Sequence, residues 1–163
     1  LNSLTEIIKG ARVEELPERI NGLINSMKEI EKELSVLRSA QALSQVGEIA
    51  KGAKVVNGTT VITSVLGDGI SGDDLRKIAL ELRSKAANSV VALISVNDSK
   101  PVLVVAASDA ARAAGVKAGA LVKIGSTVLG GGGGGKDDFA QGGGTDAAKS
   151  VDALAAISQA LVG

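Results

Sequence analysis

The chain of 163 residues contains no cysteine, histidine, tryptophan or tyrosine. Without cysteine there can be no disulfide bond or thiolate metal site, which fits a reducing compartment and makes the cytoplasm the expected location. Without histidine the commonest general base is missing, and the soft metal ligands are missing with it. We therefore expect no catalytic residue, no metal site and no cofactor in this chain.

The chain has a single aromatic residue, Phe139. It also has no net charge, since 18 basic residues balance 18 acidic ones. Base-stacking modules of the RRM or OB type need several aromatic platforms, so they are excluded. A neutral chain offers no general attraction for nucleic acid, and any contact with RNA must be local. No apolar run reaches about 18 residues, so no membrane span is predicted.

Residues 1–50 are predicted to form a helical, coiled-coil-like subdomain. The chain begins at Leu1 rather than methionine, which suggests a domain taken from a longer soluble protein. Apolar residues from Leu4 to Ala11 follow a Ser3-x-x-Glu6 capping pattern and indicate a short helix. Pro17 suits the first turn of a second helix, which should end at Gly47 or Gly52.

In the second helix the apolar residues alternate by four and three, which is typical of a coiled-coil seam of about three heptads. Its members are Leu16, Ile20, Leu23, Met27, Ile30, Leu34 and Leu37. Two partners remain open for this seam. The preceding helix could cover it as an antiparallel hairpin, or a second copy of the chain could form a homodimer through it.

Residues 51–163 are predicted to form one globular domain. Asn57-Gly58 between apolar runs predicts a β-hairpin, and the amphipathic segment 73–87 predicts a helix. Two apolar runs, separated by a turn, should be central strands. Short helices should follow, and the whole is an α+β fold with a mixed sheet and flanking helices. The strands are expected at 90–96 and 102–107, the helices at 109–114 and 118–129.

Nine of the 21 glycines lie in one stretch, Gly130 to Gly135 and Gly142 to Gly144, around the insert Lys136 to Gln141. A flexible linker is the simplest interpretation of such a composition. However, only one helical segment follows, expected over 146–161 with Thr145 as its cap. We favour an ordered loop whose N–H groups face phosphate or sugar oxygens, with Lys136 adding charge and Gln141 adding hydrogen bonds.

A nucleotide-binding P-loop is excluded, although Gly130, Gly135 and Lys136 satisfy its G-x-x-x-x-G-K part. Asp137 stands where Ser or Thr should bind magnesium, and its carboxylate would repel a phosphate. Asp137 and Asp138 are adjacent residues whose simplest role is in a turn. We therefore predict neither nucleotide hydrolysis nor dinucleotide binding.

The string from Gly130 to Gly144 resembles the signature of the DHH-associated domain, in the form that closes bacterial alanyl-tRNA synthetases. The resemblance implies binding of tRNA-Ala at the outer corner, or elbow, of the L-shaped molecule. The bound tRNA would then reach the aminoacylation and editing domains of the same enzyme, where ATP, Mg and Zn would belong. It also implies oligomer contacts in the helical region. The expected tRNA-binding residues are Gly130, Gly131, Gly132, Gly133, Gly134, Gly135, Lys136, Gln141, Gly142, Gly143, Gly144 and Lys123, with Lys117 as a weaker candidate.

Two other functions remain open. The chain could be the nucleic-acid-binding accessory domain of a DHH-family phosphoesterase, which carries a related glycine-rich domain. It could instead be a structural oligomerisation module, in which the glycine-rich segment packs against another protein surface. Phosphate contacts would separate the last alternative from the others, because they make affinity fall as salt rises.

Overall fold

The computed structural model describes residues 15–44 and 46–162. The chain forms two compact units, Leu1–Val36 and Leu37–Gly163. The short helix expected near residues 4–12 lies outside the described residues. The second unit contains every strand of the sheet and the whole glycine-rich segment.

The predicted second helix is present as α2 (Leu16–Ser44), and after residue 45 a short helix α3 (Val46–Lys51) follows. Pro17 lies in the first turn of α2, where its missing N–H costs no hydrogen bond. The predicted end of the second helix at Gly47 or Gly52 is wrong, because α2 ends at Ser44, and Gly52 instead follows the separate helix α3. The apolar seam is exposed by 44% to 67% at Ile20, Leu23, Met27, Ile30, Leu34 and Leu37.

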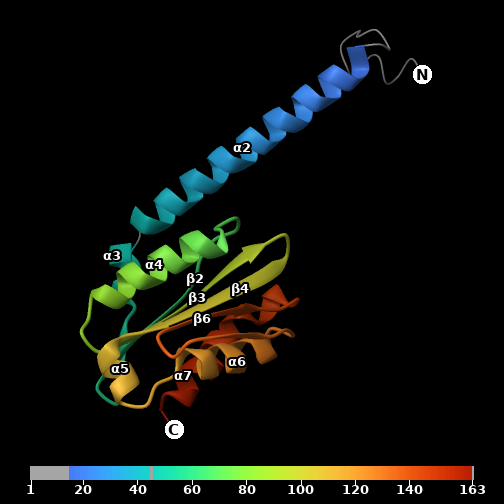
Figure 1. The fold of residues 1–163 in the computed structure, drawn as a ribbon. Coiled ribbons are helices and arrows are strands. Elements are labelled where there is room, and N and C mark those ends of the chain that lie inside the picture. The colour runs from blue at the N-terminus through green and yellow to red at the C-terminus, as the bar shows by residue number, and fades with distance from the viewer. Residues whose placement is uncertain (1–14, 45, 163) are drawn as a thin grey trace. The chain divides into compact units, whose positions relative to one another are not determined.

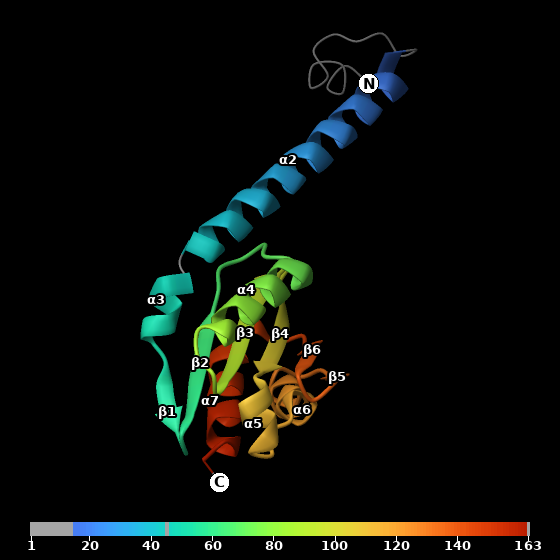
Figure 2. The same ribbon diagram turned by 60° about the vertical axis from the view of Figure 1, so that its left-hand side comes forward.

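The globular unit is built on a sheet of six strands in the order β1-β2-β3-β4-β6-β5 (Figures 1 and 2). β2 and β3 run parallel, and every other neighbouring pair runs antiparallel. The mixed sheet confirms the predicted α+β fold. The strands are β1 (Lys54–Val56), β2 (Thr59–Val65), β3 (Ser89–Asn97), β4 (Lys100–Ala107), β5 (Gly133–Gly135) and β6 (Phe139–Gly143).

The β1–β2 and β3–β4 hairpins both turn through residues with left-handed backbone. Asn57 and Gly58 have φ angles of 50° and 78° and join β1 to β2, as the Asn-Gly pair predicts. Asp98 and Ser99 have φ angles of 49° and 63° and join β3 to β4. Two-residue turns of this kind suit the right-handed twist of the strands that they connect.

Helices cover both faces of the sheet (Figures 1 and 2). The sequence predicts four helical segments after β2, and four are found: α4 (Gly72–Ser84), α5 (Asp109–Ala113), α6 (Ala118–Val128) and α7 (Ser150–Ala160). No helix in the described part of the chain is long and apolar enough to cross a membrane.

The alternation of side chains along β3 divides the core between the two faces. Val90, Ala92 and Ile94 join a buried cluster with residues of α6 and α7, whereas Val91 and Leu93 join another with residues of α4. Successive residues of a strand point to opposite faces, so a strand covered on both sides must be apolar throughout. This explains why the sequence shows uninterrupted apolar runs here.

The predicted cap of the last helix is wrong. α7 begins at Ser150, after a 3-10 turn (Ala147–Lys149), and the side chain of Asp146 accepts the N–H of Ala148 at 3.1 Å. The Thr145 hydroxyl instead donates to the carbonyl of Gly130 at 3.4 Å. Thr145 is held there because its own N–H donates to the carbonyl of Leu129 at 2.9 Å. Gly142 to Gly144 therefore do not precede a helix N-terminus directly.

Candidate functional site

The glycine-rich segment is a β-hairpin at the edge of the sheet, which makes the prediction of a loop wrong. Gly133 to Gly135 form β5, and Gly142 and Gly143 close β6. β6 pairs with β4, and β5 pairs with β6. Pairing with two neighbours satisfies the backbone of β6, whereas β5 has a neighbour on one side only. Glycine content gave no sign of strand, because glycine is usually depleted in strands.

One face of the hairpin packs directly against α6. A Cβ atom on Gly133 would lie 2.6 Å from Cγ1 of Val122 and 2.5 Å from Cα of Gly142. A Cβ atom on Gly142 would overlap the hydroxyl of Ser126, which is fully buried. Glycine is required at both positions because the helix and the strands lie too close together for a side chain.

Further glycines serve the connection between α6 and the hairpin. Gly130 has a φ of 72° and donates its N–H to Thr127, while Gly131 donates to Ser126 at 2.9 Å. These two bonds form a Schellman motif, the usual way of ending a helix on a left-handed glycine. A Cβ atom on Gly144 would overlap the carbonyl oxygen of Leu129. These glycines are therefore needed by the fold itself.

Gly132 and Gly134 differ from the other glycines of the hairpin. A Cβ atom on either would meet no atom within 4 Å, and neither has a positive φ. Both residues are exposed. The packing of this domain accepts a side chain at these two positions, so the outer face of the hairpin is open at Gly132 and Gly134.

Lys136 and Gln141 belong to the same hairpin. Lys136 is exposed, and its N–H donates to the carbonyl of Phe139 at 2.9 Å, which closes the turn. Gln141 is exposed, pairs with Gly134 across the hairpin and reaches the start of α4. Its Nε2 lies 2.8 Å from the place that a Cβ atom on Gly72 would occupy. The structure thus brings Lys136, Gln141 and the glycines together.

Lys123 is separated from Gln141 by the sheet. It is exposed on α6, which packs against one face of the hairpin, whereas Gln141 reaches α4 on the other face. Lys117 directly precedes α6 and is exposed. The predicted residues therefore occupy two sides of one hairpin.

The adjacent carboxylates occupy the turn between β5 and β6. The carbonyl of Asp137 accepts the N–H of Ala118 at 3.1 Å, and the carbonyl of Asp138 accepts the N–H of Ala107 at 2.9 Å. Both residues thus act through their backbone to attach the turn to α6 and β4. Across residues 15–44 and 46–162 no three acidic side chains gather as a set of metal ligands.

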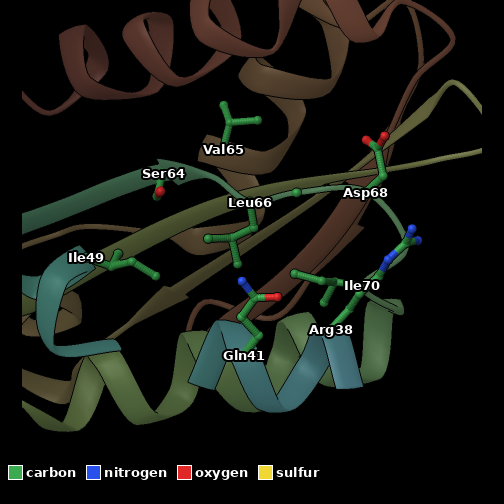
Figure 3. Close-up of a pocket in the computed structure, with 9 residues that line it drawn as sticks. Arg38, Gln41, Ile49, Ser64, Val65, Leu66, Asp68 and Ile70 are labelled. Carbon is green, nitrogen blue, oxygen red and sulfur yellow. The ribbon is translucent and has the colours of Figure 1, made fainter. Parts of the chain in front are cut away.

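A pocket of about 290 Å³ lies away from the hairpin, between the end of α2, α3 and the segment after β2 (Figure 3). Sequence reasoning missed it, because its wall is assembled from three separate segments. Arg38 and Asp68 supply charged groups to it, and none of the glycine-hairpin residues lines it. The lining residues are Arg38, Gln41, Ile49, Ser64, Val65, Leu66, Gly67, Asp68 and Ile70.

A family model described as the DHHA1 domain matches residues 58–163, which includes the whole glycine hairpin. The chain belongs to the DHHA1 domain family. This confirms the resemblance drawn from the string between Gly130 and Gly144. The match also begins at the β1–β2 turn, so it covers nearly all of the sheet.

This DHHA1 domain is similar in sequence to one part of much longer proteins. Over 163 residues it is 45% identical to an alanine–tRNA ligase of Kocuria rhizophila, covering 99% of this chain. It spans only about 18% of the length of that relative. The C-Ala domain of Aquifex aeolicus alanyl-tRNA synthetase matches with a TM-score of 0.63 and 30% identity, covering 68% of this chain and 98% of that one.

A more distant likeness concerns the fold alone. RecJ from Thermus thermophilus, solved in complex with Mg²⁺, matches with a TM-score of 0.52 and 13% identity. The match covers 80% of this chain and 19% of that protein. The DHHA1 fold therefore occurs outside the alanine–tRNA ligases, and the fold does not by itself establish a function.

Because Gly133 packs against α6 and Gly134 faces open space, substitutions at these two positions should affect stability unequally. Gly133→Ala should lower the free energy of unfolding by about 2 kcal/mol, because the new methyl group meets backbone atoms and Val122. Gly134→Ala, the matched control on the next residue, should change it by less than about 0.5 kcal/mol. Urea unfolding followed by circular dichroism measures both. Equal losses of unfolding free energy in both variants would contradict the finding that Gly133 packs against α6 while Gly134 is open.

Proposed function

We propose that this DHHA1 domain binds tRNA-Ala at the elbow of the L-shaped molecule, as part of an alanyl-tRNA synthetase in the cytoplasm. Binding there would hold one tRNA for both the aminoacylation domain and the editing domain of the enzyme. The similarity to alanine–tRNA ligases over 99% of the chain supports this setting. The chain itself supplies binding rather than chemistry.

The observation that carries the proposal is the open outer face of the glycine hairpin. At Gly132 and Gly134 a partner can approach the backbone of the strand without meeting a side chain. Folded RNA is recognised largely through its shape and its sugar-phosphate backbone, which such a surface fits. An edge strand also leaves N–H and C=O groups free on its outer side.

Lys136 and Gln141 provide polar contacts beside this surface. Lys136 would pair with a phosphate, and Gln141 can both donate to and accept from RNA groups. Lys123 would contact a phosphate from the α6 side of the hairpin. Since the chain is neutral overall, these local cations are expected to carry the salt dependence of binding.

Titration with three RNAs tests the proposal: tRNA-Ala, an unrelated tRNA and a linear RNA of equal length. Both folded tRNAs should bind more tightly than the linear RNA, and raising the salt should weaken binding because phosphate contacts release counterions. Fluorescence anisotropy at low and moderate salt measures this. Absence of salt-sensitive binding to all three RNAs would favour the structural oligomerisation module instead.

Gly134→Leu should weaken tRNA binding by about tenfold, because the side chain would stand between the strand and the RNA without disturbing the fold. Gly47→Leu is the matched control. Gly47 also has open space around its missing Cβ atom, but it lies in α3. If both variants bind tRNA as the unchanged chain does, the RNA does not approach β5 closely.

For the apolar seam of α2 we propose a second copy of the chain as the partner. The seam residues from Ile20 to Leu37 are exposed by 44% or more, and their spacing is that of a coiled coil. Burial of such a stripe between two helices would remove it from water. This proposal is independent of RNA binding.

Replacing Leu23 and Ile30 together by glutamate should weaken dimer formation at least tenfold, because like charges would replace apolar contacts in the seam. Asn21→Glu with Asn25→Glu adds the same charge outside the seam and should leave association unchanged. Sedimentation equilibrium over a range of concentrations measures dimer formation by the unchanged chain and both variants. A chain that stays monomeric at all concentrations would contradict the dimer.

A further inference from the structure

Phe139, the only aromatic residue, is covered by a cation. The guanidinium carbon of Arg76, on α4, lies 4.6 Å from the centre of the Phe139 ring. The ring is partly buried and packs against the cluster of apolar residues beneath α4. Contacts between a guanidinium group and an aromatic ring are favourable, so the ring holds Arg76 in one place on the surface.

Arg76 belongs to the same surface as the open part of the glycine hairpin. Phe139 and Gln141 are two residues apart in β6 and so point to the same face of the sheet. Gln141 pairs directly with Gly134, which places the missing side chain of Gly134 on that face too. We call this surface, made of Arg76, Phe139, Gln141 and Gly134, the α4–hairpin face.

A second arginine on α4 shows what a purely structural role looks like. Arg83 follows Arg76 by seven residues, on the same side of the helix. It is partly buried, and its guanidinium donates to the carbonyls of Ala107 and Asp138 at 3.4 and 3.5 Å. Arg76 is exposed and, within the described residues, has neither a hydrogen bond nor an ion pair, even with Asp73.

The position of the Arg76 guanidinium over the Phe139 ring suits a particular kind of ligand. The guanidinium carbon lies over the ring, and no hydrogen bond from the guanidinium N–H groups to another described residue is found, so these groups are available to a ligand. The N–H groups along one edge of a guanidinium match two oxygens of a phosphate group. Because the ring already restricts the long side chain, less conformational freedom is lost when the phosphate binds.

We propose that Arg76, held over Phe139, donates to a phosphate of the RNA strand that passes over Gly134. The inference rests on the proposed function and adds a positively charged contact on the α4 side of the hairpin, opposite Lys123. Gln141 pairs with Gly134 and follows Phe139 by two residues in β6, so it would contact the same stretch of backbone.

The test compares single-charge changes on α4, measured with folded tRNA at several salt concentrations. Arg76→Ala should lower affinity about tenfold and reduce the dependence of log affinity on log salt by roughly one, as expected for one lost phosphate contact. Arg76→Lys keeps the charge but loses the planar guanidinium group. Its affinity for tRNA should therefore lie between that of the unchanged chain and that of Arg76→Ala. Circular dichroism checks that each variant folds.

Lys85→Ala is the matched control. Lys85 directly follows α4, is exposed, and lies nine residues from Arg76, on the opposite side of an ideal helix. The variant should bind within about twofold of the unchanged chain and keep its salt dependence. Phe139→Leu should weaken binding less than Arg76→Ala, because it loosens the guanidinium group without removing it.

Two results would overturn the inference in different ways. If the unchanged chain binds tRNA and Arg76→Ala binds equally well with the same salt dependence, the contact with Phe139 is only surface packing, and the proposed function stands. If the unchanged chain shows no salt-sensitive binding to tRNA, the proposed function fails and the role of Arg76 fails with it.

Discussion

The arrangement of this domain depends on how closely α6 lies against the β5–β6 hairpin. Val122 and Ser126 of the helix occupy the space where Gly133 and Gly142 would otherwise carry side chains. Such close packing lets a strand of three glycines remain ordered, although glycine loses the most conformational freedom on folding. The hairpin exists because the helix covers one of its faces.

The opposite face of β5 is bare. Side chains in a strand alternate between two faces, so the contact with α6 requires glycine at Gly133 but not at Gly134. The packing would accept a side chain at Gly134, yet glycine leaves this face open. The polar groups on this face, Gln141 and the guanidinium of Arg76, come from β6 and α4, which are anchored in the core. A rigid support of this kind is what a surface for folded RNA requires.

The relatives give this surface its setting. Alanine–tRNA ligases contain a similar sequence as a small part of a long chain, and a solved C-Ala domain has a similar fold. RecJ shares the fold at low identity, so the general architecture is not tied to any one use of it. The features that would adapt it to tRNA are local: the open glycines, Lys136, Gln141 and Arg76.

Local chemistry in the sequence determined much of this protein. The Asn57-Gly58 turn, the apolar runs of β3 and β4 and the helices around them are predicted correctly, because each signal lies within a few neighbouring residues. The glycine segment is mistaken for a loop, since a strand of glycine is stabilised only by partners far away in the chain. Arg76 is overlooked for the same reason, because 63 positions separate it from Phe139. Only the tertiary structure decided which glycines serve packing and which remain open, because that depends on where α6 and α4 lie against the sheet.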